Sequence, residues 1–136
     1  IYGAADPHNG YGPNRYRRLA AAGDDIVLFG EGEERRDHVD VRDAAELIRL
    51  IAWHRSAGVL NAATGTVTSF REIAELVIAL SEKKVAIKGS PRQGPMPHNG
   101  YRAFDPSATL AAFPEFRYTP LADGLARAQN EMGELL

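Results

Sequence analysis

The stretch "GDDIVLFGEGEERRDHVDVRDAAELIRL", residues 23–50, carries the pattern on which the fold prediction rests. Its apolar run at residues 26–29 predicts a β-strand, and Gly30 and Gly32 predict a tight turn directly after that strand. Residues 36–41 then alternate polar and apolar side chains, so they predict a second strand. We expect the second strand either to pair with the first in a hairpin or to turn a corner away from it.

Helix signals flank this unit on both sides. Asp43, with Glu46 at the capping-box spacing, predicts the N-cap of a helix that runs to about His54, and Ser69 with Glu72 forms a second capping box. The other predicted elements are a helix at residues 13–22 ended by Gly23, strands at residues 59–64 and 84–89, a Pro/Gly-rich loop at residues 89–106, and helices that start near Asp105 and Thr119. This order predicts a mixed α/β fold in a single domain that spans residues 1–136.

Composition narrows the class of protein. Hydrophobic residues make up 44% of the chain and charged residues 25%, which is ordinary for a soluble globular domain. The net charge of −2 shows no basic excess of the kind that favours nucleic-acid binding. The chain contains no cysteine, so disulfides and thiolate chemistry are excluded. It has no apolar run of the roughly 18 residues that a membrane span needs, and we therefore expect neither a nucleic acid nor a membrane as a partner.

The usual catalytic and metal-binding patterns are absent from the sequence. The four histidines are scattered without a metal-ligand spacing, and we expect His38 to be a half-buried polar residue in the wall of a cleft. A G-x-S-x-G nucleophile motif and a Tyr-x-x-x-Lys pair do not occur. Gly30 and Gly32 form a bare G-x-G among acidic residues, where a phosphate group would be repelled.

Arginines are the remaining candidates for ligand binding. Arg36 follows the turn, whereas Arg92 and Arg102 lie in the Pro/Gly-rich loop, and two guanidinium groups that face one cleft would suit a diphosphate. Spacing alone favours the alternative, in which these arginines form surface salt bridges with Glu33, Glu34 or Asp37. The arginines of the first helix, Arg15, Arg17 and Arg18, are expected to form a solvated face.

The sequence resembles the C-terminal half of the extended short-chain dehydrogenases/reductases (SDRs), the NAD-dependent nucleotide-sugar epimerases and dehydratases. In the quoted stretch the G-x-G turn is followed at the family's positions by Arg36, Asp37, Val39, Val41, Asp43 and Ala45. The segments "IYG", "GVLNAATG", "SPRQG", "FDPS" and "TPLADGL" extend the resemblance over nearly the whole chain, in the family's order and spacing.

The resemblance implies the substrate lobe, with the last strand-helix units, of an extended Rossmann-type enzyme. Arg36 and Arg92 would hold the diphosphate of a nucleoside-diphosphate sugar. The strand residues Val27, Leu28 and Phe29 would lie along the nucleobase, and Asn9 and Asn14 would lie near the substrate entrance.

The family's NAD-binding loop and proton-relay residues precede the part that this chain matches, and the chain starts with Ile1. The resemblance therefore implies that NAD or NADP is bound mainly by an N-terminal half absent from this chain. We expect no catalytic residue here, and we expect the chain alone to be inactive. The parent protein would be a cytoplasmic NAD-dependent epimerase or dehydratase, and therefore an isomerase or a lyase. Its oligomeric state stays open, with a homodimer as one possibility.

Several positions depart from the family pattern and keep other functions open. They are Ala4 and Ala5 after "IYG", His38 in place of an aromatic residue, Pro95 in place of an acid and Ala108 in place of a lysine. One alternative is an extended SDR reductase that acts on a non-nucleotide ketone. Another is a non-catalytic module for ligand binding or protein interaction.

Overall fold

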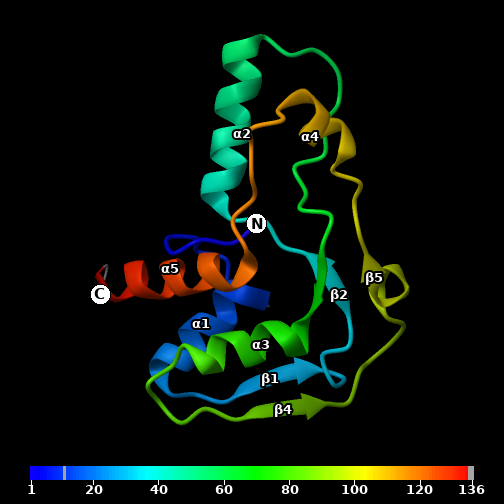
Figure 1. Cartoon of the computed structure of the whole chain (residues 1–136). Helices are drawn as coiled ribbons and strands as arrows, with labels where there is room; N and C mark the ends of the chain where they lie inside the picture. Colours follow the sequence, from blue (N-terminus) through cyan, green and yellow to red (C-terminus); the bar gives the residue numbers. More distant parts are fainter. Residues whose placement is uncertain (11, 135–136) are drawn as a thin grey trace.

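Two small β-sheets and the helices around them form the fold that the computed structural model describes for residues 1–10 and 12–134 (Figure 1). The elements along the chain are α1 (Gly12–Ala22), β1 (Ile26–Phe29), β2 (Arg35–Asp37), α2 (Val41–His54), β3 (Val67–Ser69), α3 (Phe70–Ala79), β4 (Ile87–Ser90), the 3-10 helix η1 (Pro97–Gly100), β5 (Tyr101–Arg102), α4 (Ser107–Ala112) and α5 (Leu121–Glu134). The predicted mixture of α and β elements is confirmed. Within these residues no helix is long and apolar enough to cross a membrane.

The strands β1 and β2 belong to different sheets, so the hairpin prediction is wrong and the corner is what forms. β1 pairs with β4 in parallel, from Ile26 opposite Ile87 to Phe29 opposite Ser90. β2 lies between β3, which is antiparallel to it, and β5, which is parallel. The turn between β1 and β2 bends the chain away from the first sheet, because both of its glycines adopt positive φ angles, +58° at Gly30 and +77° at Gly32.

The main core lies between the first sheet and the helices α1, α3 and α5. Ile26 and Leu28 of β1 are buried at 0% and 1% exposure, whereas Val27 and Phe29 on the opposite face are 49% and 63% exposed. This alternation leaves one face of β1 open. The buried residues of the core are Tyr2, Tyr16, Ala20, Ile26, Leu28, Ile73, Ala74, Val77, Val85 and Leu125. A second, smaller cluster places Leu47 of α2 against Phe113 and Phe116.

Arg17 lies in this core, which corrects the expectation that the basic residues of α1 form a solvated face. Its side chain is 0% exposed, and its guanidinium donates to the carbonyls of Ala128 and Gly3, at 2.7 Å each, and to Oδ1 of Asn14 at 3.1 Å. Burial lowers the pKa of the Arg17 guanidinium. Backbone carbonyls bond the guanidinium in place of the water that it loses on burial. The periodicity of the sequence does not indicate such partners.

Asp40, not Asp43, is the N-cap of α2. Its carboxylate accepts from the amide of Arg42 at 2.9 Å. Asp43 lies one turn further on, where it is 8% exposed and accepts from the amide and the hydroxyl of Thr119 at 2.7 and 2.9 Å. The helix begins earlier than predicted because Tyr2 bonds the backbone on both sides of Asp40, at Val39 and Val41.

Residues 59–64 form no strand, and the nearby strand β3 starts at Val67. The carboxylate of Asp37 accepts from the amides of Thr64 and Gly65, at 3.1 and 2.8 Å, which occupies backbone donors that a sheet would need. The capping box of Ser69 and Glu72 is confirmed by both of its hydrogen bonds, at 3.1 and 2.7 Å. The other predicted helices and the strand at residues 84–89 are found, with shifts of a few residues at their ends.

Candidate ligand-binding cleft

A cleft of about 320 Å³ opens beside the exposed end of β1. Its walls come from segments far apart in the sequence, among them α1, the β1–β2 turn, α3 and the loop after β4. The lining residues are Tyr16, Phe29, Glu34, Arg36, Phe70, Arg92, Pro97, His98 and Arg102.

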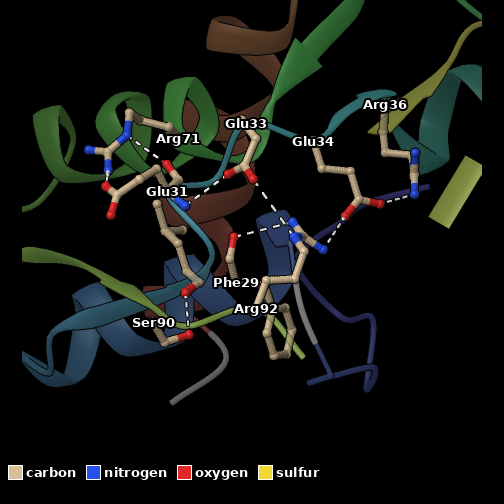
Figure 2. A network of polar contacts seen from close by, with 9 residues as sticks. Phe29, Glu31, Glu33, Glu34, Arg36, Arg71, Ser90 and Arg92 are labelled. Carbon is tan, nitrogen blue, oxygen red and sulfur yellow. Dashed lines mark hydrogen bonds and ion pairs between the residues drawn. The ribbon is translucent and has the colours of Figure 1, made fainter. Parts of the chain in front are cut away.

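The fold brings Arg36 and Arg92 to this one cleft. Arg36 lies in the central strand β2, opposite Thr68 of β3 and Arg102 of β5. Arg92 lies two residues after the end of β4, and the parallel pairing of β4 with β1 places it beside Phe29, whose carbonyl accepts from Arg92 at 3.4 Å. The arrangement that a diphosphate would require, two arginines from separate segments in one cleft, is therefore present (Figure 2).

The side chain of Glu34 lies between the two arginines. This side chain is 10% exposed and accepts from Nη2 of Arg36 and, at 3.4 Å, from Nη1 of Arg92. The more exposed Glu33 forms a longer ion pair with Nε of Arg92 at 3.7 Å. The salt bridges with Glu33 and Glu34 that spacing favoured are therefore formed, and the two arginines also line one cleft (Figure 2). Asp37 instead bonds the segment of Thr64 and Gly65.

Arg102 adds a third guanidinium at the edge of the cleft. Its Nη1 lies 3.0 Å from Nε2 of His98, and its Cζ lies 5.3 Å from the centre of the Phe104 ring. His98 and the next residue, Asn99, both adopt a positive φ of 52°. This left-handed pair turns the chain back toward the cleft, so that η1 and β5 form one side of it.

Aromatic side chains form the apolar part of the cleft. The rings of Tyr16 and Phe70 meet edge to face, with their centres 6.5 Å apart, and Phe29 is 63% exposed next to Arg92. Burial raises the pKa of Tyr16 to about 12, so its phenol stays neutral at physiological pH. Flat apolar surfaces beside guanidinium groups suit a ligand that carries a planar ring and an anionic group.

The remaining predicted site residues lie outside the lining of this cleft. Val27 shares the exposed face of β1 with Phe29, whereas Leu28 is buried, with its side chain in the core and its carbonyl accepting from the Ser90 hydroxyl at 2.7 Å. Asn9 is an exposed acceptor for Arg18 at 3.5 Å. Asn14 is 3% exposed, and its amide group bonds Gly3, Asp6 and Arg17. Asn14 therefore holds the N-terminal loop in place.

Sequence reasoning missed the cleft roles of Tyr16, Phe70, Pro97 and His98. Phe70 has a clear signal only for its helix, because it follows the cap Ser69 and begins the apolar stripe of α3. Nothing in the local pattern shows that its ring meets Tyr16, since that contact depends on the packing of α1 against α3.

His38 forms part of a second cavity, of about 350 Å³, together with Thr64, Thr66, Thr68 and residues 118–121. The prediction of a partly buried histidine in a cleft wall is confirmed. The His38 ring meets Phe70 edge to face at 5.9 Å, and its buried Nε2 has no hydrogen-bond partner. Burial lowers the pKa of His38 to about 4. Among the residues that the structure describes, no three His, Cys, Asp or Glu side chains are grouped to hold a metal ion.

Comparison with known proteins bears out the expected family resemblance. Residues 1–63 match the model of the NAD dependent epimerase/dehydratase family. The search of curated proteins gave no match.

Solved structures share the fold over almost the whole chain. Pal from Bacillus thuringiensis has a TM-score of 0.84 at 20% identity and matches 99% of this chain with 44% of its own. UDP-glucose 4-epimerase from Thermotoga maritima, solved with UDP-glucose, has a TM-score of 0.77 at 22% identity, with coverages of 98% and 43%. dTDP-glucose 4,6-dehydratase from Bacillus anthracis, solved with NAD, has a TM-score of 0.82 at 20% identity, with coverages of 98% and 42%. The chain thus spans less than half the length of these structures.

Proposed function

From the match of residues 1–63 to the NAD-dependent epimerase/dehydratase family, we propose that this chain binds the substrate of a nucleoside-diphosphate-sugar epimerase or dehydratase. The observation that carries the proposal is the meeting of Arg36 and Arg92 in one cleft. Guanidinium groups bind phosphate oxygens through paired, charge-assisted hydrogen bonds and stay charged at any working pH. A diphosphate offers oxygens to both arginines at once.

The exposed face of β1 beside the cleft offers a place for the nucleobase. In our proposal the base lies along the exposed face of β1, where Phe29 and Val27 present apolar side chains. The rings of Tyr16 and Phe70 extend this apolar surface. A bound base would bury apolar area, and its orientation would be fixed by the diphosphate on the arginines.

The cofactor that the family name implies, NAD or NADP, supplies hydride transfer when it is bound. The glycine turn of this chain does not fit the pyrophosphate of such a cofactor. A Cβ at Gly30 would lie 2.7 Å from the carboxylate of Glu33, so acidic oxygens fill the space that a phosphate would need. We therefore assign to this chain the binding and orientation of the substrate, and no role in hydride transfer.

Calorimetric titration of the protein with UDP, GDP and dTDP tests the proposal. We expect one of these nucleotides to bind, and we expect Arg36→Ala and Arg92→Ala each to weaken its binding by about 1.5–3 kcal/mol, the value of a hydrogen bond to a charged group. Arg35→Ala is the matched control, because Arg35 is the neighbour of Arg36 on β2 but pairs with Glu72 and Val67. Equal binding by wild type and Arg36→Ala would count against the assignment.

A reductase that acts on a ketone without a nucleotide is the second candidate. The observation in its favour is Glu34, whose carboxylate offsets part of the positive charge of the two arginines. The same titration separates the two candidates. Such a reductase part would bind none of the three nucleotides, whereas a nucleotide-sugar site would bind at least one.

A further inference from the structure

The carboxylate of Glu34 is buried between Arg36 and Arg92, the two arginines that we propose to bind the substrate diphosphate. Glu34 is 7% exposed and contacts Arg36 and Arg92 at the same time (Figure 2). Both arginines are themselves mostly covered, with side-chain exposures of 18% and 19%. Solvent therefore screens the interactions among these three charges much less than it screens surface ion pairs.

Glu34 sets the charge that the cleft presents to a ligand. Arg36, Arg92 and Arg102 carry three positive charges and Glu34 carries one negative charge, so Glu34 lowers the net positive charge that the cleft presents to a ligand. Glu33 lowers this further, but it is 47% exposed and 3.7 Å from Arg92, so its effect is smaller. The site can hold phosphate groups, and each additional negative charge on the ligand meets the fixed charge of Glu34.

The charge of the ligand differs between a nucleoside diphosphate and its sugar ester. The terminal phosphate of a free nucleoside diphosphate has a second ionisation with a pKa near 6, so above neutral pH it carries one more negative charge than the sugar ester, in which that oxygen is bonded to the sugar. A fixed carboxylate beside the phosphate site repels the extra charge.

We infer that Glu34 is a specificity-determining residue, which lowers the affinity of the cleft for a free nucleoside diphosphate more than its affinity for a diphosphate that is esterified on both sides. This inference rests on the proposed function, because it concerns the same arginine cleft. Through this charge, the site would distinguish the sugar nucleotide from the free nucleoside diphosphate without any contact to the sugar.

The test compares two dissociation constants, for UDP and UDP-glucose, in wild type and in Glu34→Gln at about pH 8, where the terminal phosphate is fully ionised. The corresponding GDP or dTDP pair is used if that nucleotide is the one that binds. We expect Glu34→Gln to improve the affinity for the free nucleotide about five- to tenfold more than the affinity for its sugar ester. Loss of arginine positioning would weaken both ligands together and leave their ratio unchanged, so the ratio separates charge selection from a structural role.

Glu31→Gln is the matched control, because Glu31 belongs to the same turn but pairs with Arg71 outside the cleft. It removes the same charge and should leave the ratio as in wild type. An unchanged ratio in Glu34→Gln, with both ligands bound, overturns the inference while the proposed function stands. Absence of binding by every nucleotide and sugar nucleotide in wild type refutes the proposed function itself.

A second measurement on the wild-type protein covers the case in which Glu34→Gln does not fold. Near pH 5 the terminal phosphate of UDP takes up a proton, and its charge then equals that of UDP-glucose. We expect the preference for the sugar ester to shrink several-fold between about pH 8 and pH 5. A preference that is the same at both pH values contradicts charge selection.

Discussion

The guanidinium of Arg17 donates a 2.7 Å hydrogen bond to the main-chain carbonyl of Ala128, and this bond ties α1 to α5 through the core. A second bond of 2.7 Å reaches the carbonyl of Gly3 in the N-terminal loop. The same side chain therefore joins three segments of the chain, and through α1 it supports Tyr16 in the cleft wall. The Nε of Arg17 is buried without a hydrogen-bond partner, so the site already carries an unsatisfied donor.

Replacement of Arg17 by methionine should destabilise the protein by about 3 kcal/mol, because the carbonyls of Gly3 and Ala128 each lose a charged donor while the volume is roughly kept. Urea denaturation measures this change. Arg15→Met is the control on the same helix: Arg15 bonds the exposed Gly10 carbonyl, and its loss should cost under about 0.5 kcal/mol. Equal stabilities of the two variants would show that Arg17 is not a structural link.

Asp40 combines a helix cap with an ion pair, and two substitutions separate these roles. One carboxylate oxygen accepts from the Arg42 amide at 2.9 Å, and the other accepts from Arg127 of α5 at 2.6 Å. Asp40→Asn keeps a cap acceptor and loses the charge, so it should cost about 1 kcal/mol, whereas Asp40→Ala loses both and should cost about 2–3 kcal/mol. Thermal unfolding measures the loss of stability in each variant. A smaller loss in Asp40→Ala than in Asp40→Asn would contradict the assignment of the cap.

The elements that the sequence predicts correctly are those whose signal lies within a few residues. The capping box of Ser69 and Glu72 needs only one helical turn to form, and the strand of residues 26–29 is a compact apolar run. Asp40 and Asp43 show the limit of such signals. Both carboxylates lie near the start of α2, and residues distant in the sequence determine which of them caps the helix. Tyr2 fixes the backbone around Asp40, whereas Thr119 donates to Asp43.

The cleft could be predicted only in part, for the same reason. The charge chemistry of Arg36 and Arg92 is visible in the sequence, but their meeting depends on the parallel pairing of β1 with β4, which joins strands far apart in the chain. The sequence also names Glu33 and Glu34 as salt-bridge partners without showing that Glu34 contacts both arginines. Whether a charged pair is open to a ligand is decided by such tertiary contacts, not by spacing.

Gly32, in the turn between β1 and β2, has no room for a side chain. This steric effect can be measured separately from the effect of its positive φ angle. Gly32 and Gly94 adopt nearly the same φ, +77° and +78°. A Cβ at Gly32 would lie 2.6 Å from a methyl group of Leu28 and 2.9 Å from the Arg71 amide, whereas a Cβ at Gly94 has no atom within 4 Å. Gly94→Ala should therefore cost only about 1 kcal/mol of conformational strain. Gly32→Ala should cost about 3 kcal/mol or more, because it adds overpacking.

Chemical denaturation of both alanine variants checks this difference. Because Glu34 and Arg36 follow the turn directly, Gly32→Ala should also weaken nucleotide binding, while Gly94→Ala leaves the turn intact. Equal losses of stability in the two variants would show that the turn relaxes around an added methyl group.

His38 should make the stability of the protein depend on pH between about 6.5 and 4. Burial lowers its pKa from 6.5 to about 4 in the folded state, so in this range the unfolded chain binds a proton that the folded protein does not. Stability is therefore full above about pH 6.5, falls as the pH falls, and is lower by about 3 kcal/mol once the pH reaches the folded-state pKa. Urea denaturation at several pH values measures this contribution.

Two variants isolate the contribution of His38 from that of other titrating groups. His38→Phe keeps an aromatic ring against Phe70 and removes the unpartnered Nε2. It should be more stable than wild type by about 1 kcal/mol at neutral pH, because the cost of burying that nitrogen disappears. It should also lose about 3 kcal/mol of the wild-type pH dependence. His54→Gln, at an exposed position on α2, should keep the full dependence. If the pH profiles of wild type and His38→Phe coincide, the histidine is not buried in its neutral form, and the cavity beside it must be open to water at the Nε2 atom.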